Sequence, residues 1–114
     1  MNSIILDIKK FLGLVEEYTV FDSDIIMHAN SAFMTLSQLG VGDVDYFMIE
    51  DMTKTWSDFV SDVHIQSFVK QYVYLKVRIL FDPPANTHVL ESINKTIDEL
   101  EWRMMKELEV VRKI

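Results

Sequence analysis

Residues 65–84 read Ile-Gln-Ser-Phe-Val-Lys-Gln-Tyr-Val-Tyr-Leu-Lys-Val-Arg-Ile-Leu-Phe-Asp-Pro-Pro, and they form the most apolar long run of the chain. At 3.6 residues per turn, apolar side chains would cover most of the girth of a helix here. The broadest apolar face contains Ile65, Phe68, Val69, Tyr72, Leu75, Ile79 and Leu80. A helix this apolar belongs in the middle of a fold, and the double proline after it must end it.

A β-strand is the alternative for the second half of this run. Over residues 72–81, Val, Leu, Ile and Phe alternate with Tyr, Lys and Arg, a period of two that is typical of a half-buried strand. Residues 65–71 do not alternate, however. Lys76 and Arg78 also suit the last turn of a helix, where backbone carbonyls lack partners. We therefore predict a central helix and keep the strand as the alternative.

The length and composition indicate one domain over residues 1–114, large enough to bury a core without covalent cross-links. The chain has no cysteine, which excludes disulfides and thiolate metal sites. The first residues do not resemble a secretory signal, because Lys9 and Lys10 follow the apolar residues. No apolar run approaches the roughly 20 residues that span a bilayer. We expect a protein of a cytoplasm-like compartment that uses no membrane.

The net charge of −7 is unevenly distributed: residues 1–63 sum to −8 and residues 64–114 to +1. Tight binding to nucleic acids requires clustered Lys and Arg side chains that displace counterions. The sequence contains no such cluster. Specific DNA binding is therefore not expected.

The remaining segments complete an all-α fold, a small bundle of about four helices. Residues 3–12 predict a short amphipathic helix that stops at Gly13. Residues 22–39 predict a second helix, capped by Asp22, with Phe21 and Ile26 at the positions of a hydrophobic staple. Residues 87–112 predict the longest helix. The expected core residues are Ile26, Phe33, Leu36, Phe68, Tyr72, Leu75, Ile79, Ile93, Ile97 and Leu100.

Residues 43–60 are a structured excursion between the second helix and the central one. Residues 46–49 could form a short strand, and residues 55–59 predict a single helical turn. Tyr46, Phe47, Trp56 and Phe59 are too apolar for a solvated linker, so we expect them to pack. Asp62 or Ser61 would then cap the central helix.

The longest predicted helix carries an apolar seam over residues 90–111, stepping by three or four residues. Trp102 falls on the opposite side of this helix, with Met105 one turn further on. Tryptophan is favoured at protein interfaces, so Trp102, Met105 and Glu109 are candidates for a subunit interface. The alternative is that another part of the chain, such as residues 43–60, covers Trp102.

Candidate catalytic chemistry is missing. His28, His64 and His88 each lack a second metal ligand at helical spacing. The aspartates at 22–24 and 43–45 lack the glycine of a calcium loop, and the sequence has no nucleophile elbow or phosphate-binding glycine loop. We therefore predict no enzyme activity, no cofactor and no metal site.

Blocks at residues 21–42, 55–59, 69–84 and 99–103 resemble, in the same order, the head–tail connector family of tailed bacteriophages and prophages. These proteins are also called adaptor or head-completion proteins. The similarity runs from about residue 5 to residue 103. Its most specific parts are Phe-Asp-Pro-Pro at 81–84 and Glu-Trp-Arg at 101–103. Neither is a catalytic motif, so the resemblance implies a structural part.

Such proteins are helical bundles that assemble as rings, usually of twelve copies, under the portal of a DNA-filled capsid. The resemblance implies three partners: further copies of the chain, the portal protein, and a stopper or tail-completion protein. DNA would pass through the ring without being specifically bound. The implied location is the virion neck between head and tail, after assembly in the cytoplasm of the host bacterium.

The C-terminal segment in this family commonly docks into the portal, which here implies a docking tail over residues 105–114. Its proposed portal contacts are Val110, Val111, Arg112, Lys113 and Ile114. The alternative for this tail is a frayed helix end. For the whole protein, the alternatives are a cytoplasmic helical regulator that dimerises through the 90–111 seam and a small helix-turn-helix DNA binder.

Overall fold

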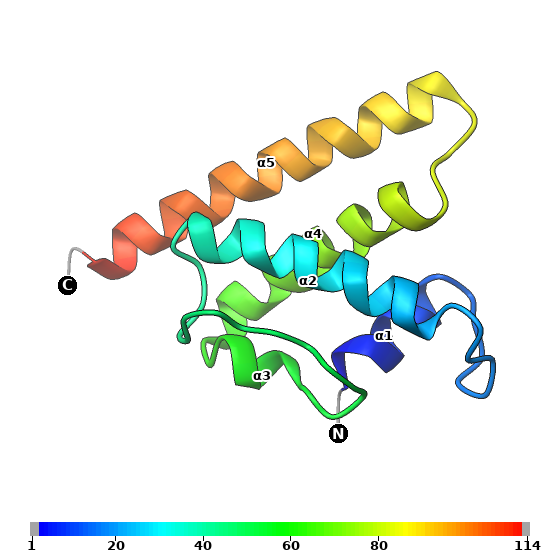
Figure 1. Cartoon of the computed structure of the whole chain (residues 1–114). Helices are drawn as coiled ribbons and strands as arrows, with labels where there is room; N and C mark the ends of the chain where they lie inside the picture. The colour runs from blue at the N-terminus through cyan, green and yellow to red at the C-terminus, as the bar shows by residue number, and fades with distance from the viewer. Residues whose placement is uncertain (1–2, 113–114) are drawn as a thin grey trace.

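A computed structural model describes residues 3–112 of the chain, with side chains described for residues 3–109 (Figure 1). Within this range the secondary structure is helical, with a single isolated bridge between Ser3 and Thr55. The helices are α1 (Ile4–Phe11), α2 (Asp22–Gln38), α3 (Trp56–Phe59), α4 (Val63–Phe81) and α5 (Thr87–Arg112). The predicted all-α bundle is confirmed, with α3 as a short addition to the four longer helices.

The central helix is α4, as its apolar girth predicts. The Asp62 carboxylate caps it by accepting hydrogen bonds from the backbone N–H groups of His64, at 2.8 Å, and Ile65, at 3.1 Å. The helix packs against every other helix and ends at Phe81, directly before the Asp-Pro-Pro corner. The strand alternative for residues 72–81 is therefore wrong, because apolar side chains on all sides of this segment find helical partners.

The buried core lies between α2 and α4 and is closed by aromatic rings. The Phe33 ring of α2 lies 4.7 Å from Phe59, 5.0 Å from Phe47 and 6.1 Å from Trp56, measured between ring centres. Most of the aliphatic core comes from α1, α2 and α4, and includes Ile4, Ile8, Ile25, Leu36, Val69, Val73 and Val77. The aromatic contacts to Phe33 hold residues 43–60 against the bundle.

Half of the predicted core residues are fully buried: Phe33, Leu36, Tyr72, Ile97 and Leu100. The other five, Ile26, Phe68, Leu75, Ile79 and Ile93, are only partly buried and pack against the edge of the core. Helical periodicity identified the apolar face correctly in each case. Whether a residue lies at the centre or the edge of that face depends on neighbouring helices.

The excursion contains no strand at 46–49, so this prediction is wrong. Tyr46 has a φ of 57°, which breaks the extended backbone that a strand requires. A side chain replaces the missing strand partner: the Asn30 amide accepts from the Ile49 N–H at 2.8 Å and donates to the Ile49 carbonyl at 2.9 Å. Tyr46 is 96% exposed, contrary to expectation.

The predicted helical turn at 55–59 is present as α3. The Asp58 carboxylate accepts from the Thr55 N–H at 2.8 Å, completing a capping box. The hydrogen bond from the Thr55 backbone N–H, together with one from the Thr55 side chain, lowers the pKa of Asp58, since both favour the ionised carboxylate. Trp56 is buried, and its indole Nε1 donates to Asp7 Oδ2 at 2.7 Å. This bond ties α3 to α1.

The start of α2 differs from the prediction. Phe21 is the N-cap residue and makes no side-chain cap, so Asp22 does not cap this helix. Instead, Asp22 Oδ1 lies 2.8 Å from the ammonium of Lys9, whose side chain is 1% exposed. The contact is not directed as a hydrogen bond, since Oδ1 has no hydrogen-bond partner among the described residues. Lys9 also donates to the Glu16 carbonyl at 2.8 Å, so the buried cation is compensated twice.

The long helix α5 packs antiparallel to α4 and lies along one edge of the molecule (Figure 1). Its buried residues are Ile97, Leu100 and Met104. The Tyr72 hydroxyl of α4 donates to Glu101 at 3.0 Å, and His64 lies 3.5 Å from Glu107. The predicted apolar seam is therefore used inside the chain, against α4.

Candidate functional site

The most conspicuous exposed aromatic residue on a helix is Trp102, whose side chain is 61% exposed. Met105, one turn further, is 41% exposed. The Lys106 ammonium lies 5.5 Å from the centre of the indole ring and 3.6 Å from the Glu109 carboxylate. We call Trp102, Met105, Lys106 and Glu109 the Trp102 surface.

The position of Trp102 on α5 explains its exposure. Successive helical residues turn by about 100°, so Trp102 lies nearly opposite Met104, which is buried against the rest of the fold. Within residues 3–112, α5 packs substantially only against α4. Because its side chain is 61% exposed, the alternative that residues 43–60 cover Trp102 is wrong. The interface role of Trp102, Met105 and Glu109 remains a prediction.

A second exposed apolar surface lies beside α2, on the side of the helix away from its buried residues Phe33 and Leu36. Sequence reasoning did not identify this surface. Asn30, Met34, Ser37 and Gln38 of α2, together with residues 45–48, line a groove of about 570 Å³. We call it the α2 groove. Met34 is 59% exposed, and Met48 and Met27 of the same region are also exposed. Two methionines on the outer face of α2 are the only sequence signal that could have revealed it.

The α2 groove is held open by local structure. The hydrogen bonds between Asn30 and Ile49 anchor one end of the 45–48 segment to α2, and Phe47 packs on Phe33 beneath it. At the other end, Gly42 has a φ of 108° and lies against Phe59, where an added Cβ would come within 2.7 Å of the ring. Tyr46 is thereby held at the rim with its side chain in solvent.

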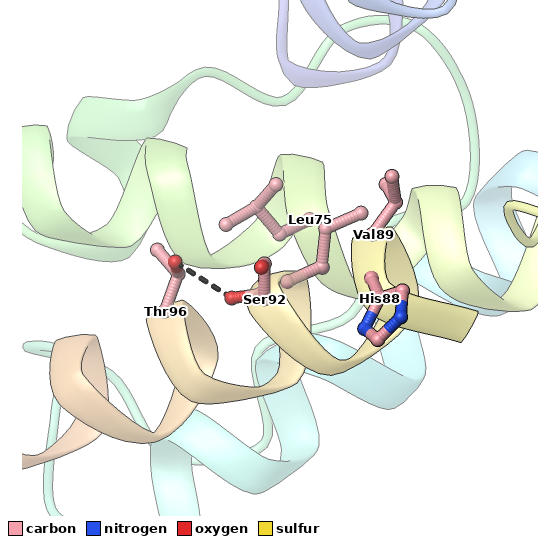
Figure 2. A pocket seen from close by; sticks show the side chains of 6 residues that line it. Leu75, His88, Val89, Ser92 and Thr96 are labelled. Atoms are coloured by element: carbon pink, nitrogen blue, oxygen red, sulfur yellow. Dashed lines mark hydrogen bonds between the residues drawn. The ribbon is translucent and has the colours of Figure 1, made fainter. Parts of the chain in front are cut away.

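A shallower hollow of about 330 Å³ lies between α4 and the first turns of α5. Figure 2 shows Leu75 and Val89 on its apolar side and His88 at its edge. The Thr96 hydroxyl donates to the Ser92 carbonyl at 3.0 Å, so this hydroxyl is hydrogen-bonded within its own helix. The lining residues place the hydroxyls of Ser92 and Thr96 on the same helix as His88 and include no acidic side chain. The hollow therefore lacks a carboxylate that would orient His88 as a base toward a hydroxyl.

Titratable groups elsewhere have structural roles. Burial raises the pKa of the Tyr72 hydroxyl strongly, and its hydrogen bond to Glu101 raises it further. Burial also raises the pKa of Tyr74. Within the described residues, no three His, Asp or Glu side chains gather where they could hold a metal ion. His28, His64 and His88 lie on α2, α4 and α5, in separate surroundings.

The predicted docking tail is described only in part. The backbone of residues 110–112 continues α5, while the side chains of Val110, Val111 and Arg112 lie outside the described residues. Lys113 and Ile114 lie outside them entirely. No helix within residues 3–112 combines the length and apolar character needed to cross a bilayer.

A family model described as phage connector protein matches residues 4–110, which is nearly the whole chain. No curated protein and no solved structure matches the chain. The match agrees with the resemblance of the 81–84 corner and the 101–103 step, which both lie inside the matched range.

The match and the geometry agree on a structural component. The described residues leave two apolar surfaces exposed, and the family is one of phage connectors that associate with head and tail parts of the virion. This chain therefore belongs to the phage connector protein family.

Proposed function

We propose that the chain is a ring subunit of the virion neck that joins the capsid portal to the stopper or tail. Twelve copies are the family expectation. The observation that carries the proposal is the Trp102 surface, an apolar surface that the fold leaves uncovered on its longest helix. An exposed tryptophan on a rigid helix is the kind of residue that dominates binding energy at protein interfaces.

A ring needs subunits with two different lateral faces, because each copy contacts one neighbour on each side. Modest contacts repeated around a closed ring add up to a stable assembly, even when a single pair of subunits binds weakly. The flat shape of the subunit, with extents of 45 × 35 × 20 Å, offers broad faces for such contacts.

The ring would allow DNA to pass without holding it. Residues 1–63 carry a net charge of −8, and phosphates are repelled by such a surface. The chain also lacks the clustered Lys and Arg side chains that hold DNA by counterion release. We expect no specific DNA binding and no catalytic turnover, and the helix-turn-helix alternative loses support for the same reason.

We place the portal contact at the end of the docking tail 105–114, in residues 110–114, which leaves Met105 and Glu109 to face a neighbouring copy. Residues 1–114 act as one connector domain. Figure 1 shows the last turns of α5 extending beyond the rest of the fold. A helix end that projects in this way can reach into a partner without disturbing the bundle. Val110, Val111, Arg112, Lys113 and Ile114 are the proposed contacts. Assembly would take place in the cytoplasm of the host bacterium, with the virion neck as the final location.

The alternative of a regulator that dimerises through the 90–111 seam is disfavoured by a specific observation. Ile97, Leu100 and Met104 of that seam are buried inside the chain. Dimerisation through them would have to expose the contact between α4 and α5.

Native mass spectrometry and electron microscopy, with and without the portal protein of the same phage, test the proposal. We expect closed rings, either alone or on the portal. A protein that remains a monomer or dimer in the presence of portal would contradict it. Hydrolysis of a nucleotide or phosphodiester at ordinary enzyme rates would contradict the structural role as well.

A further inference from the structure

We propose that the Trp102 surface of one copy docks into the α2 groove of the next copy, so that neighbouring subunits join head to tail. The inference rests on the ring proposed above and names its lateral contact. It commits to a second copy of this chain as the occupant of the groove.

The two surfaces lie on different sides of the subunit. α2 and α5 each pack against α4, and within the described residues they make no substantial contact with each other. Trp102 points away from the α4 side of α5, and Met34 lies on the side of α2 opposite the buried Phe33 and Leu36 face. Two different surfaces on two sides of one subunit produce a heterologous contact, which closes into a ring when the rotation between copies allows it.

The chemistry of the groove fits an indole. Met34 and Met48 offer thioethers, which pack favourably against aromatic rings and adapt to their shape. A volume of about 570 Å³ can take the ring of a tryptophan together with part of a methionine. A buried indole N–H needs an acceptor, and Gln38 and Asp45 line the same groove with side-chain oxygens. Neither side chain makes a hydrogen bond within the described chain.

One pair of opposite charges can meet across the two surfaces. Asp45 lines the α2 groove, and Lys106 belongs to the Trp102 surface. Both surroundings are otherwise mixed in charge, since Lys54 lies 5.9 Å from the centre of the Phe47 ring and Glu109 lies beside Lys106. Arg103 is paired with Glu99 at 2.6 Å, and Lys106 lies 3.6 Å from Glu109. Both cations are about half exposed, so they can also face a partner. A contact between Asp45 and Lys106 would orient the two copies.

The absence of cysteine allows a direct test by cross-linking. In the variant Met34→Cys/Met105→Cys, a short thiol-reactive cross-linker should join the groove of one copy to the α5 surface of the next. Because each copy has one donor and one acceptor surface, we expect a ladder of multimers that extends to the ring. Each single variant is the matched control and should give no cross-linked product. Both positions are exposed, so the fold should be preserved, which circular dichroism checks.

The outcomes separate this inference from the ring itself. Dimers from Met105→Cys alone would show that α5 pairs with α5 and would overturn the head-to-tail contact. Rings seen by native mass spectrometry without cross-linking of the double variant would also overturn it, while leaving the ring proposal intact. A wild-type chain that forms no ring even with portal would refute the proposed function and the inference together.

A charge reversal gives an independent measurement on folded protein. Asp45→Lys and Lys106→Asp should each weaken assembly, and the double variant should regain part of it if the two residues face each other across the contact. If the double variant loses as much assembly as the two single losses added together, the two residues do not face each other, and the pairing is overturned.

Discussion

The substitution Trp102→Ala separates an interface residue from a core residue, and Trp56→Ala is its matched control. Trp102 is 61% exposed and Trp56 is 2% exposed. Trp102→Ala removes a cation–π contact with Lys106, which at an exposed site contributes about 0.5–1 kcal/mol. Alanine is also the better helix former, which returns a few tenths of a kcal/mol. The free energy of unfolding of the monomer should therefore fall by less than about 1 kcal/mol.

Trp56→Ala should behave very differently. It leaves a cavity next to Phe33 and removes the hydrogen bond to Asp7, so we expect a loss of about 3–5 kcal/mol. With a urea dependence of about 2 kcal/mol/M, the unfolding midpoint should fall by about 2 M, compared with less than about 0.5 M for Trp102→Ala.

Urea unfolding followed by circular dichroism measures both changes, and native mass spectrometry measures assembly. Trp102→Ala should keep the monomer folded and impair ring formation. A fall in the urea midpoint as large as that of Trp56→Ala would show that Trp102 belongs to the core. Normal rings from a stable Trp102→Ala variant would refute its role at the interface.

Three further substitutions or conditions test the fold. Gly42→Ala should cost about 1–3 kcal/mol in unfolding experiments, because its φ is 108° and the new Cβ would meet the Phe59 ring at 2.7 Å. Lys9→Met should cost about 3 kcal/mol, since the Asp22 carboxylate would lose its cation. Stability should also fall as the pH rises through about 10, because burial raises the pKa of Tyr72 in the fold above that of the unfolded chain. The part of the tyrosinate absorbance that Tyr72→Phe removes should appear together with unfolding, whereas the exposed Tyr18 and Tyr46 contribute separately.

Each of these has a control. Gly13 has a φ of 81°, but nothing lies within 4 Å of a Cβ added there. Gly13→Ala should therefore lower the free energy of unfolding only by the backbone strain, about 1 kcal/mol. If it costs as much as Gly42→Ala, the contact at Gly42 is unimportant. Asp22→Asn in the Lys9→Met background should restore part of the lost stability. Tyr72→Phe should flatten the alkaline transition, and an unchanged transition would assign it to another group.

Much of the fold could be predicted from local sequence. The apolar girth of residues 65–81 and the prolines after them determine a central helix, because side-chain periodicity and proline geometry act within a few residues. The single turn at 55–59 and the Asp62 cap are local in the same sense. For the candidate site, the phase of Trp102 predicted that it lies opposite the seam of its own helix, but whether another segment covers it was decided only by the tertiary structure.

Other features depended on residues far apart in sequence. The burial of Lys9 requires Asp22 and the Glu16 carbonyl, and the 45–48 segment needs Asn30 in place of a strand partner. The α2 groove exists only because that segment lies beside α2 and lines the groove together with it. The sequence by itself determined the helices and the outward side of α5, since these follow from the geometry of one chain segment. Only the tertiary structure decided where a second apolar surface lies, because a groove is formed by two segments and neither one carries its pattern alone.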